Sequence, residues 1–303
     1  MMRAVLLHEY GDVNQLRYEE AEMPKFGANE VLVKVRATSV NPIDWKIRSG
    51  EARARMPINL PTILGRDLAG EIVDIGSDVK GLSKGMRVMG LTNRTYAEFT
   101  SAKAEDLAPI PESISFEQAA ALPLVTLTGA QLIELGVKPK AGQTVLVTGA
   151  LGSVGRTAVH VAKQHGAKVL AGVRASEKRT AEGLEVDRVV AIDDDEEIDQ
   201  LHDLDAIADT VGGMTISKLL KSIRAGGVLG SVLGQPKDAP KYNIQVNALM
   251  SKPDSSRLRQ LAEEVGRGEF SIPVAQVLPL SDIQEAHKLA ESGHAGGKIV
   301  LVP

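Results

Sequence analysis

The run VLVTGALGSVG, from Val145 to Gly155, constrains the fold of this 303-residue chain more than any other segment. Apolar and β-branched residues predict a buried strand, a glycine-rich turn follows, and a helical pattern begins near Ser153. The spacing Ala150-x-Gly152-x-x-Gly155 matches the dinucleotide-binding fingerprint, with alanine in the first glycine position. Gly152 would let a pyrophosphate approach the backbone, and Gly155 would let the helix pack closely. A glycine-rich strand–helix turn without a ligand is the alternative interpretation.

The predicted helix start gives this turn an affinity for anions. The first amides of a helix have no partner within the helix, and the helix dipole places partial positive charge there. A diphosphate group can therefore bind to such a turn. We predict that the amides of Ser153 and Val154 face the phosphates, and that the cofactor-binding residues of the turn are Ala150, Leu151, Gly152, Ser153 and Val154.

The residue after the second predicted strand of this region indicates which nicotinamide coenzyme binds. An acidic residue about 20 positions after the fingerprint would bind the ribose hydroxyls of NAD. Arg174 occupies this position, since 174 − 155 = 19, and Ser176 and Lys178 follow it. A guanidinium group can bind a phosphate through two hydrogen bonds, whereas a carboxylate would repel it. The sequence therefore predicts NADPH as the cofactor, and an exposed helix start whose charges bind nothing is the alternative.

The chain shows two different patterns of predicted secondary structure. Short apolar strands alternate with helical segments over 124–270, which predicts a parallel sheet covered by helices on both faces. Residues 1–123 instead show β-strand patterns separated by glycine, proline, asparagine and aspartate. The final strand pattern, at 298–302, has no helical partner, so we predict that it rejoins the first region. The expected fold class is α/β, with a doubly wound parallel sheet at 124–270 inserted in a β-rich domain formed by 1–123 and 271–303.

Composition excludes several classes of function. There is no cysteine, so no disulfide, thiolate nucleophile or thiolate zinc ligand can form. The net charge of −4, without long blocks of one sign, argues against nucleic acid or an anionic membrane as a partner. No apolar run reaches the ~18–20 residues of a membrane span, and a cytoplasmic location is expected. The histidines are scattered and form no recognisable metal site: His8, His160, His165, His202, His287 and His294.

Several longer motifs follow one another in a characteristic order along the chain. They are RAVLLHEYG, SVNPIDWKIRSG, GRDLAGEIVDIGSDVKGLSKGMRV, TYAEF, AALPLVTLTGAQLIEL, GALGSVG and GGKIVLV. Together they resemble the medium-chain dehydrogenase/reductase superfamily, and within it the zinc-free quinone oxidoreductase branch. The resemblance covers essentially the whole chain. It implies a GroES-like β domain, an inserted Rossmann domain, a cofactor between them and a homodimer.

The resemblance also bears on metal chemistry. Zinc alcohol dehydrogenases of the same superfamily hold their metal with a cysteine, a His-Glu pair and a second cysteine. The corresponding positions here look like Asn41, the pair Arg66-Asp67, and Pro123–Leu124. Soft ligands are absent from all three, so no catalytic zinc is expected. Without a Lewis acid to polarise an isolated carbonyl, we expect hydride transfer from NADPH to a small-molecule quinone or α,β-unsaturated carbonyl.

Further site residues are implied by the resemblance alone. Asn41 would lie near the nicotinamide and Thr128 would contact its ribose or carboxamide, and these two are the candidates for the catalytic region. Val211, Ser231 and Leu233 would line the cofactor. Asn41 has the alternative role of shaping a turn before a proline, and Thr128 that of capping or packing a helix. No general acid is assigned.

Two other residues and two rival functions remain open. Trp45 is expected either to stack on a flat substrate or to pack in the core. Lys298 is expected either to approach the cofactor or to stabilise the register of the last strand. The rival functions are an enoyl-thioester reductase and a non-catalytic NADPH-binding protein, acting as a redox sensor or a structural protein.

Overall fold

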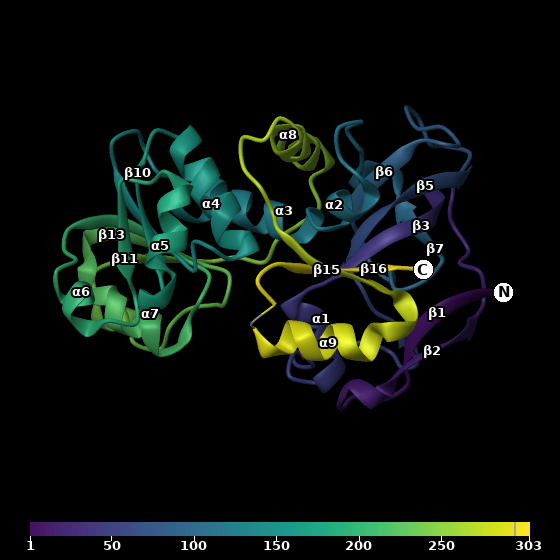
Figure 1. The fold of residues 1–303 in the computed structure, drawn as a ribbon, viewed down its shortest axis with the longest axis horizontal. Coiled ribbons are helices and arrows are strands. Elements are labelled where there is room, and N and C mark those ends of the chain that lie inside the picture. Colours follow the sequence, from purple (N-terminus) through teal and green to yellow (C-terminus); the bar gives the residue numbers. More distant parts are fainter. Residues whose placement is uncertain (294) are drawn as a thin grey trace. The chain divides into compact units, whose positions relative to one another are not determined.

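The structure is a computed structural model that describes residues 1–293 and 295–303, so His294 lies outside the described residues. The chain forms two compact units (Figure 1). Unit 1 contains Met1–Leu124 and Pro253–Pro303, and unit 2 contains Val125–Lys252. Unit 2 is therefore inserted in the sequence of unit 1. Within the part of the chain that the structure describes, no helix combines the length and apolar character needed to cross a bilayer.

Unit 2 contains a six-stranded sheet in which every paired neighbour is parallel. The spatial order is β11-β10-β9-β12-β13-β14, so the order reverses between β9 and β12. This reversal is the point at which open α/β sheets bind ligands, beyond the carboxyl ends of the strands. The strands are β9 (Thr144–Thr148), β10 (Lys168–Val173), β11 (Arg188–Ala191), β12 (Leu204–Asp209), β13 (Ile223–Ser231) and β14 (Gln245–Ala248).

The helices of unit 2 begin where the sequence patterns change period. The longest, α4, begins directly after the glycine-rich turn and buries Ala158, Val161 and Ala162 along one side. Residues three and four positions apart share a helix face, so this stripe packs onto β9 and β10. The helices are α3 (Pro123–Gln131), which contains the boundary between the units, α4 (Ser153–Gln164), α5 (Lys178–Ala181), α6 (Asp195–Asp199) and α7 (Gly213–Leu219), with a π-helical segment at Leu132–Val137.

Unit 1 is rich in antiparallel β-structure. A three-stranded sheet has the order β2-β1-β4, and a seven-stranded sheet has the order β15-β16-β3-β5-β6-β8, with β7 paired to β3. Alternate residues of β3, among them Val31, Val33 and Val35, point into the core, as the alternating pattern predicts. The strands are β1 (Met2–Leu7), β2 (Leu16–Ala21), β3 (Glu30–Val40), β4 (Thr62–Ile63), β5 (Asp67–Ile75), β6 (Arg87–Leu91), β7 (Phe99–Lys103), β8 (Leu107–Pro109), β15 (Val274–Pro279) and β16 (Lys298–Val302).

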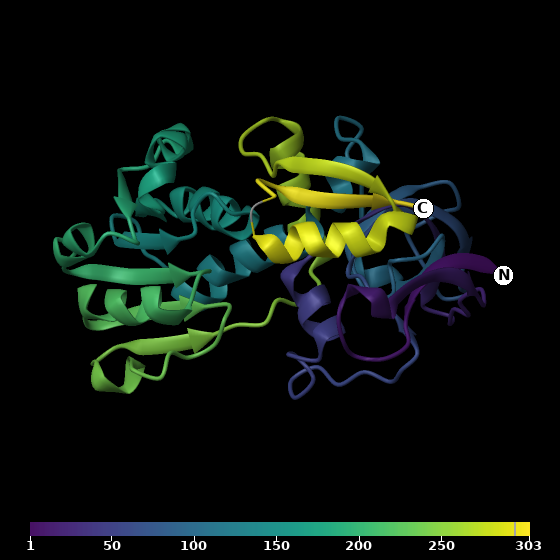
Figure 2. The ribbon, with the colours of Figure 1, turned by 60° about the horizontal axis from the view of Figure 1, so that its bottom comes forward.

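The last strand rejoins the first region, as predicted. β16 pairs antiparallel with the end of β3, where Ile299 faces Val40, and parallel with β15. Helix α9 lies alongside β15 and β16 (Figure 2) and is capped by Gly293, whose positive φ of 70° favours glycine. The helices of unit 1 are α1 (Pro42–Ser49), α2 (Phe116–Ala120), α8 (Ser255–Gly266) and α9 (Ile283–Ser292).

The second boundary between the units differs from the sequence expectation. Unit 2 ends at Lys252 rather than at Phe270, because α8 belongs to unit 1. There α8 packs against β8, and the backbone of Gly266 lies so close to Ser113 that a Cβ would be 2.3 Å from its Oγ. The amphipathic pattern of α8 predicts a buried face but does not indicate which unit buries it.

Candidate functional site

The glycine-rich turn of unit 2 has the geometry of an anion-binding turn. Gly149 adopts a positive φ of 64°, and Ala150 donates its amide hydrogen bond to Gly172 on β10. A Cβ on Gly155 would lie 2.1 Å from the carbonyl oxygen of Gly149, so this glycine is required by the turn itself. On Gly152, which is exposed, a Cβ would be 3.2 Å from that oxygen. The structure therefore brings the predicted phosphate-binding residues together at the start of α4.

A buried carboxylate organises the neighbouring strand ends. Asp209, the last residue of β12, is 1% exposed. Its Oδ1 accepts hydrogen bonds from Thr148 Oγ1 at 3.0 Å, from the Val211 amide at 3.1 Å and from the Gly212 amide at 2.9 Å. Its Oδ2 accepts one from Ser231 Oγ at 2.9 Å. Asp209 thus connects β9, β12 and β13 at the edge where a dinucleotide is expected.

Asp209 is not among the residues predicted from the sequence, but three predicted residues, Val211, Ser231 and Leu233, lie on or next to the loops that it holds. The hydroxyl of Ser231 is buried and also accepts the amide hydrogen bond of Leu233 at 3.1 Å, so it is committed to partners in the protein. The side chains of Val211 and Leu233 are 44% and 43% exposed. An aspartate that ends an apolar strand, as in LDAIAD, is the signal that would have identified Asp209.

The two predicted cations after β10 differ in their partners: among the described residues Lys178 is in an ion pair and Arg174 is not. Arg174 is exposed and forms no ion pair with any described residue. The Nζ of Lys178 lies 2.6 Å from Oε1 of Glu197, which lowers the pKa of that carboxyl. Asp193 accepts the amide hydrogen bond of Ala175 at 2.7 Å and so fixes the loop. Ser176, on the same loop, is exposed. Lys178 is therefore neutralised within the protein, whereas Arg174 is available to a ligand.

Thr128 lies on α3, half-buried, next to a close helix contact. A Cβ on the neighbouring Gly129 would be 2.6 Å from the carbonyl oxygen of Val154, so α3 crosses the first turn of α4 without room for a side chain. This packing holds Thr128 near the glycine-rich turn.

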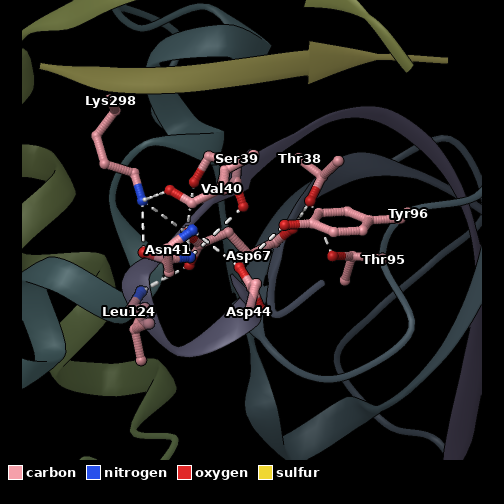
Figure 3. A network of polar contacts seen from close by, with 10 residues as sticks. All are labelled: Thr38, Ser39, Val40, Asn41, Asp44, Asp67, Thr95, Tyr96, Leu124 and Lys298. Atoms are coloured by element: carbon pink, nitrogen blue, oxygen red, sulfur yellow. Dashed lines mark hydrogen bonds and ion pairs between the residues drawn. The ribbon is translucent and has the colours of Figure 1, made fainter. Parts of the chain in front are cut away.

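In unit 1 the predicted residue Asn41 belongs to a buried polar network (Figure 3). Its Nδ2 donates to Asp67 Oδ2 at 2.7 Å, and its Oδ1 accepts from Lys298 Nζ at 2.5 Å. Lys298 also donates to the carbonyl of Val40 at 3.1 Å and lies 3.3 Å from Asp67. The amide of Leu124 donates to Asp67 Oδ1 at 2.7 Å. Both ends of the Asn41 side chain are therefore occupied by partners inside the unit.

This network does not fit a zinc ion. It joins Asn41, Asp67 and Leu124, three of the positions that the resemblance relates to the metal ligands of zinc alcohol dehydrogenases. The carboxylate of Asp67 is already neutralised by the ammonium group of Lys298, whose side chain is 6% exposed. A divalent cation would have to displace this ammonium and would find no thiolate or imidazole among these donors.

A second carboxylate, Asp44, lies at the start of α1 beside this network. Its Oδ2 accepts hydrogen bonds from the Asn41 amide at 2.8 Å and from Tyr96 Oη at 3.0 Å. Burial raises the pKa of Asp44 to about 6, and the charge of Asp67 raises it as well, whereas these hydrogen bonds and Lys298 lower it. Burial and the neighbouring Asp44 raise the pKa of Tyr96 well above its usual value. Trp45 follows on the same helix, with its Nε1 buried and without a hydrogen-bond partner among the described residues.

Asp44→Asn is expected to alter the pH dependence of stability. Because the pKa of Asp44 is raised from 3.8 to about 6 on folding, its contribution is fully present below about pH 4 and is lost as pH rises through 6. The unfolding free energy of the variant minus that of the wild type should therefore increase by about 2–3 kcal/mol between pH 4 and 7. Denaturant unfolding followed by the fluorescence of Trp45, the sole tryptophan, measures this difference in unit 1. A pH-independent difference would contradict the prediction.

His287 changes the stability with pH in the opposite direction to Asp44, but its effect is the same in the variant and the wild type. Burial, assisted by the charge of Arg48, lowers the pKa of His287 from 6.5 to about 3. Its contribution to stability is present above pH 6.5 and is lost as pH falls towards 3. Since both proteins contain His287, the difference between them isolates Asp44.

The comparisons with known proteins agree with this architecture. Residues 27–112 match the family model described as alcohol dehydrogenase GroES-like domain, and residues 184–301 match the one described as zinc-binding dehydrogenase. The second description refers to zinc, but the chain contains no cysteine and Lys298 already neutralises Asp67.

Full-length relatives and solved structures extend these matches over the whole chain. An NADPH-dependent alkenal/one oxidoreductase of Arabidopsis thaliana is 31% identical over 100% of this chain and 80% of the relative. A quinone oxidoreductase of Rattus norvegicus is 29% identical over 100% and 98%. The structure of a quinone oxidoreductase from Coxiella burnetii has a TM-score of 0.90 at 28% identity and covers 100% and 99%. The chain therefore belongs to the zinc-free quinone oxidoreductase branch of the medium-chain dehydrogenase/reductase superfamily, with a Rossmann unit inserted in a GroES-like unit, and is an oxidoreductase of this type.

Proposed function

We propose that the protein is an NADPH-dependent oxidoreductase that transfers hydride to a quinone or an α,β-unsaturated carbonyl compound. The observation that carries the coenzyme assignment is Arg174, exposed and unpaired among the described residues at the carboxyl end of β10. Support for the reaction class comes from relatives named quinone oxidoreductase and NADPH-dependent alkenal/one oxidoreductase. A mycobacterial neighbour at 27% identity and a TM-score of 0.87 was solved in complex with NADPH.

The residues of unit 2 fit a dinucleotide. The open face at Gly152 and the free amides at the start of α4 would bind the diphosphate. Arg174 would bind the 2′-phosphate through its guanidinium, with Ser176 as a neutral donor beside it. The loops held by Asp209 would present the apolar side chains of Val211 and Leu233 to the coenzyme. Bound NADPH supplies the hydride.

The acceptor reaction needs little acid–base chemistry from this chain. Hydride adds to a carbon conjugated with a carbonyl group, the negative charge moves to the carbonyl oxygen, and a proton from water completes the reduction. The contribution of the protein is to position the two reactants and exclude water. An enoyl-thioester reductase with a tyrosine acid is less favoured, because Tyr96 is fully buried and donates its hydrogen bond to Asp44.

A screen of acceptors tests the proposal. NADPH oxidation is followed at constant protein concentration with quinones, enones, aldehydes and enoyl thioesters, each with and without a metal chelator. We expect turnover with at least one quinone or enone and no effect of the chelator. Activity lost on chelation, or tight NADPH binding without oxidation by any acceptor, would contradict it, and the second result would favour a sensor. A cytoplasmic location and a homodimer stay predictions.

Arg174→Asp is expected to weaken the preference for NADPH over NADH. The change replaces a phosphate-binding cation by an anion, so the Kd for NADPH should rise at least tenfold, or about 1.4 kcal/mol, while that for NADH changes little. Because Arg174 is exposed, stability should change by no more than about 0.5 kcal/mol. Lys140→Asp, an equal charge change at an exposed site before β9, is the matched control. Similar losses of NADPH affinity in both variants would show that the loss comes from the net charge of the protein and not from the position of Arg174.

A further inference from the structure

Asp209 is a buried carboxylate without a countercharge. Its four hydrogen-bond donors are two hydroxyl groups and two backbone amides, all of them neutral. It forms no ion pair with any residue that the structure describes, although it is 1% exposed. A carboxylate without an ion-pair partner is costly to bury even when it is hydrogen-bonded, and a neutral amide side chain would accept most of these hydrogen bonds at lower cost.

The position of this anion in the fold is equally specific. Asp209 ends β12, and its oxygens reach Thr148 at the end of β9 and Ser231 at the end of β13. The strand order reverses between β9 and β12, so the carboxylate lies at the switch point of the sheet, on the edge that carries the glycine-rich turn. The loop after β12 is hydrogen-bonded to Asp209 through the Val211 amide. The loop after β13 follows Ser231, whose hydroxyl group donates to the same carboxylate.

We propose that the negative charge of Asp209 favours the oxidised form of the bound coenzyme. This inference rests on the proposed function. When the nicotinamide ring gives up a hydride, carrying two electrons, it changes from neutral to positively charged, and the acceptor gains the electron pair and the hydrogen. A fixed anion without a countercharge at the ligand-binding edge stabilises that new positive charge. Only an interaction that differs between the two redox forms assists the transfer.

A purely structural role for Asp209 makes a different prediction. If the carboxylate only held the two loops in place, its loss would weaken both redox forms of the coenzyme by the same factor. The ratio of the two dissociation constants therefore separates the electrostatic role from the structural one. This ratio is measured by binding alone and does not require turnover.

Asp209→Asn removes the charge and keeps most of the geometry. The amide oxygen can still accept from Thr148, Val211 and Gly212, and the amide nitrogen can donate to Ser231 Oγ. We expect the Kd for NADP⁺ to rise about tenfold more than the Kd for NADPH, by titration calorimetry for the oxidised form and nicotinamide fluorescence for the reduced form. Ser231→Ala is the control, because it removes one donor to the same carboxylate but keeps the charge. It should change both constants by the same factor.

The possible outcomes distinguish failure of the proposed function from failure of the electrostatic role of Asp209. If the wild-type protein binds neither coenzyme form, the proposed function fails. If it binds both and Asp209→Asn leaves the ratio unchanged, the electrostatic role is overturned while the proposed function stands. Should Asp209→Asn not fold, Val211→Lys compared with Val211→Gln replaces it, since this side chain is exposed and the buried hydrogen bonds stay intact. The lysine cation should shift the ratio in the same direction as Asp209→Asn, and an unchanged ratio overturns the inference.

Discussion

Replacing Lys298 by methionine is expected to reduce the free energy of unfolding by about 3–5 kcal/mol. The ammonium group is buried between Asp67, Asn41 and the carbonyl of Val40. Its loss would leave the fully buried carboxylate of Asp67 without a countercharge. The carbonyl oxygen of Val40 and Oδ1 of Asn41 would also lose the donor that Lys298 supplies. Methionine has a similar length, so the effect reports the charge rather than a cavity. Denaturant unfolding followed by Trp45 fluorescence at pH 7 measures the change in unit 1.

A double variant distinguishes the lost charge from lost packing. Asp67→Asn combined with Lys298→Met removes both charges and should recover most of the stability lost in Lys298→Met, because no uncompensated ion remains. Lys80→Met, at an exposed position, is the surface control and should change stability by no more than about 0.5 kcal/mol. A loss below about 1 kcal/mol in Lys298→Met would contradict the role given to the ion pair.

Gly155→Ala should strongly weaken coenzyme binding and destabilise unit 2, whereas Gly152→Ala should mainly weaken binding. A Cβ on Gly155 would lie 2.1 Å from the carbonyl oxygen of Gly149 and 2.8 Å from Cα of Ala150, and these backbone atoms belong to the turn. Moving them should cost about 2–3 kcal/mol of stability and raise the Kd for NADPH at least about 100-fold. Circular dichroism during thermal unfolding and nicotinamide fluorescence measure the two effects.

The second glycine provides the comparison. A Cβ on Gly152 would be 3.2 Å from a single carbonyl oxygen, so the turn accommodates it with a stability change of about 0.5–1 kcal/mol. The added methyl group would nevertheless occupy the exposed face where the diphosphate is expected to meet the backbone. Unchanged NADPH affinity in Gly152→Ala would place the phosphates elsewhere. Unchanged stability in Gly155→Ala would show that the turn can relax.

The sequence predicts those parts of the fold whose signals are local. The strand, turn and helix around Val145–Gly155 follow one another within a few residues, and each has its own residue preferences. The lack of a helical partner predicts that the last strand joins the first region, and its pairing with β3 confirms this. The boundary after Lys252 was not predicted, since the buried face of α8 is visible in the sequence but its partner is not.

The polar clusters were not predicted, because their members are far apart in the chain. Lys298 and Asp67 are 231 residues apart, and no spacing rule connects them. The sequence left two roles open for Lys298, and the structure shows its Nζ donating to the backbone of β3 and to a buried network. Asp209 was missed for the same reason, as its partners Thr148 and Ser231 lie on other strands. Lys178 looked available in the sequence because Glu197 lies 19 residues away.

The inserted arrangement of the chain has a consequence for its synthesis. Residues 125–252 are continuous, so all six strands of the Rossmann sheet can pair as soon as they leave the ribosome. The GroES-like sheet has to wait, because β3 pairs with β16, whose first residue is Lys298. Until then the carboxyl end of β3 lacks a neighbour on one side, and the carboxylate of Asp67 lacks its cation. Translation therefore imposes an order in which the inserted domain matures first and the surrounding domain closes last.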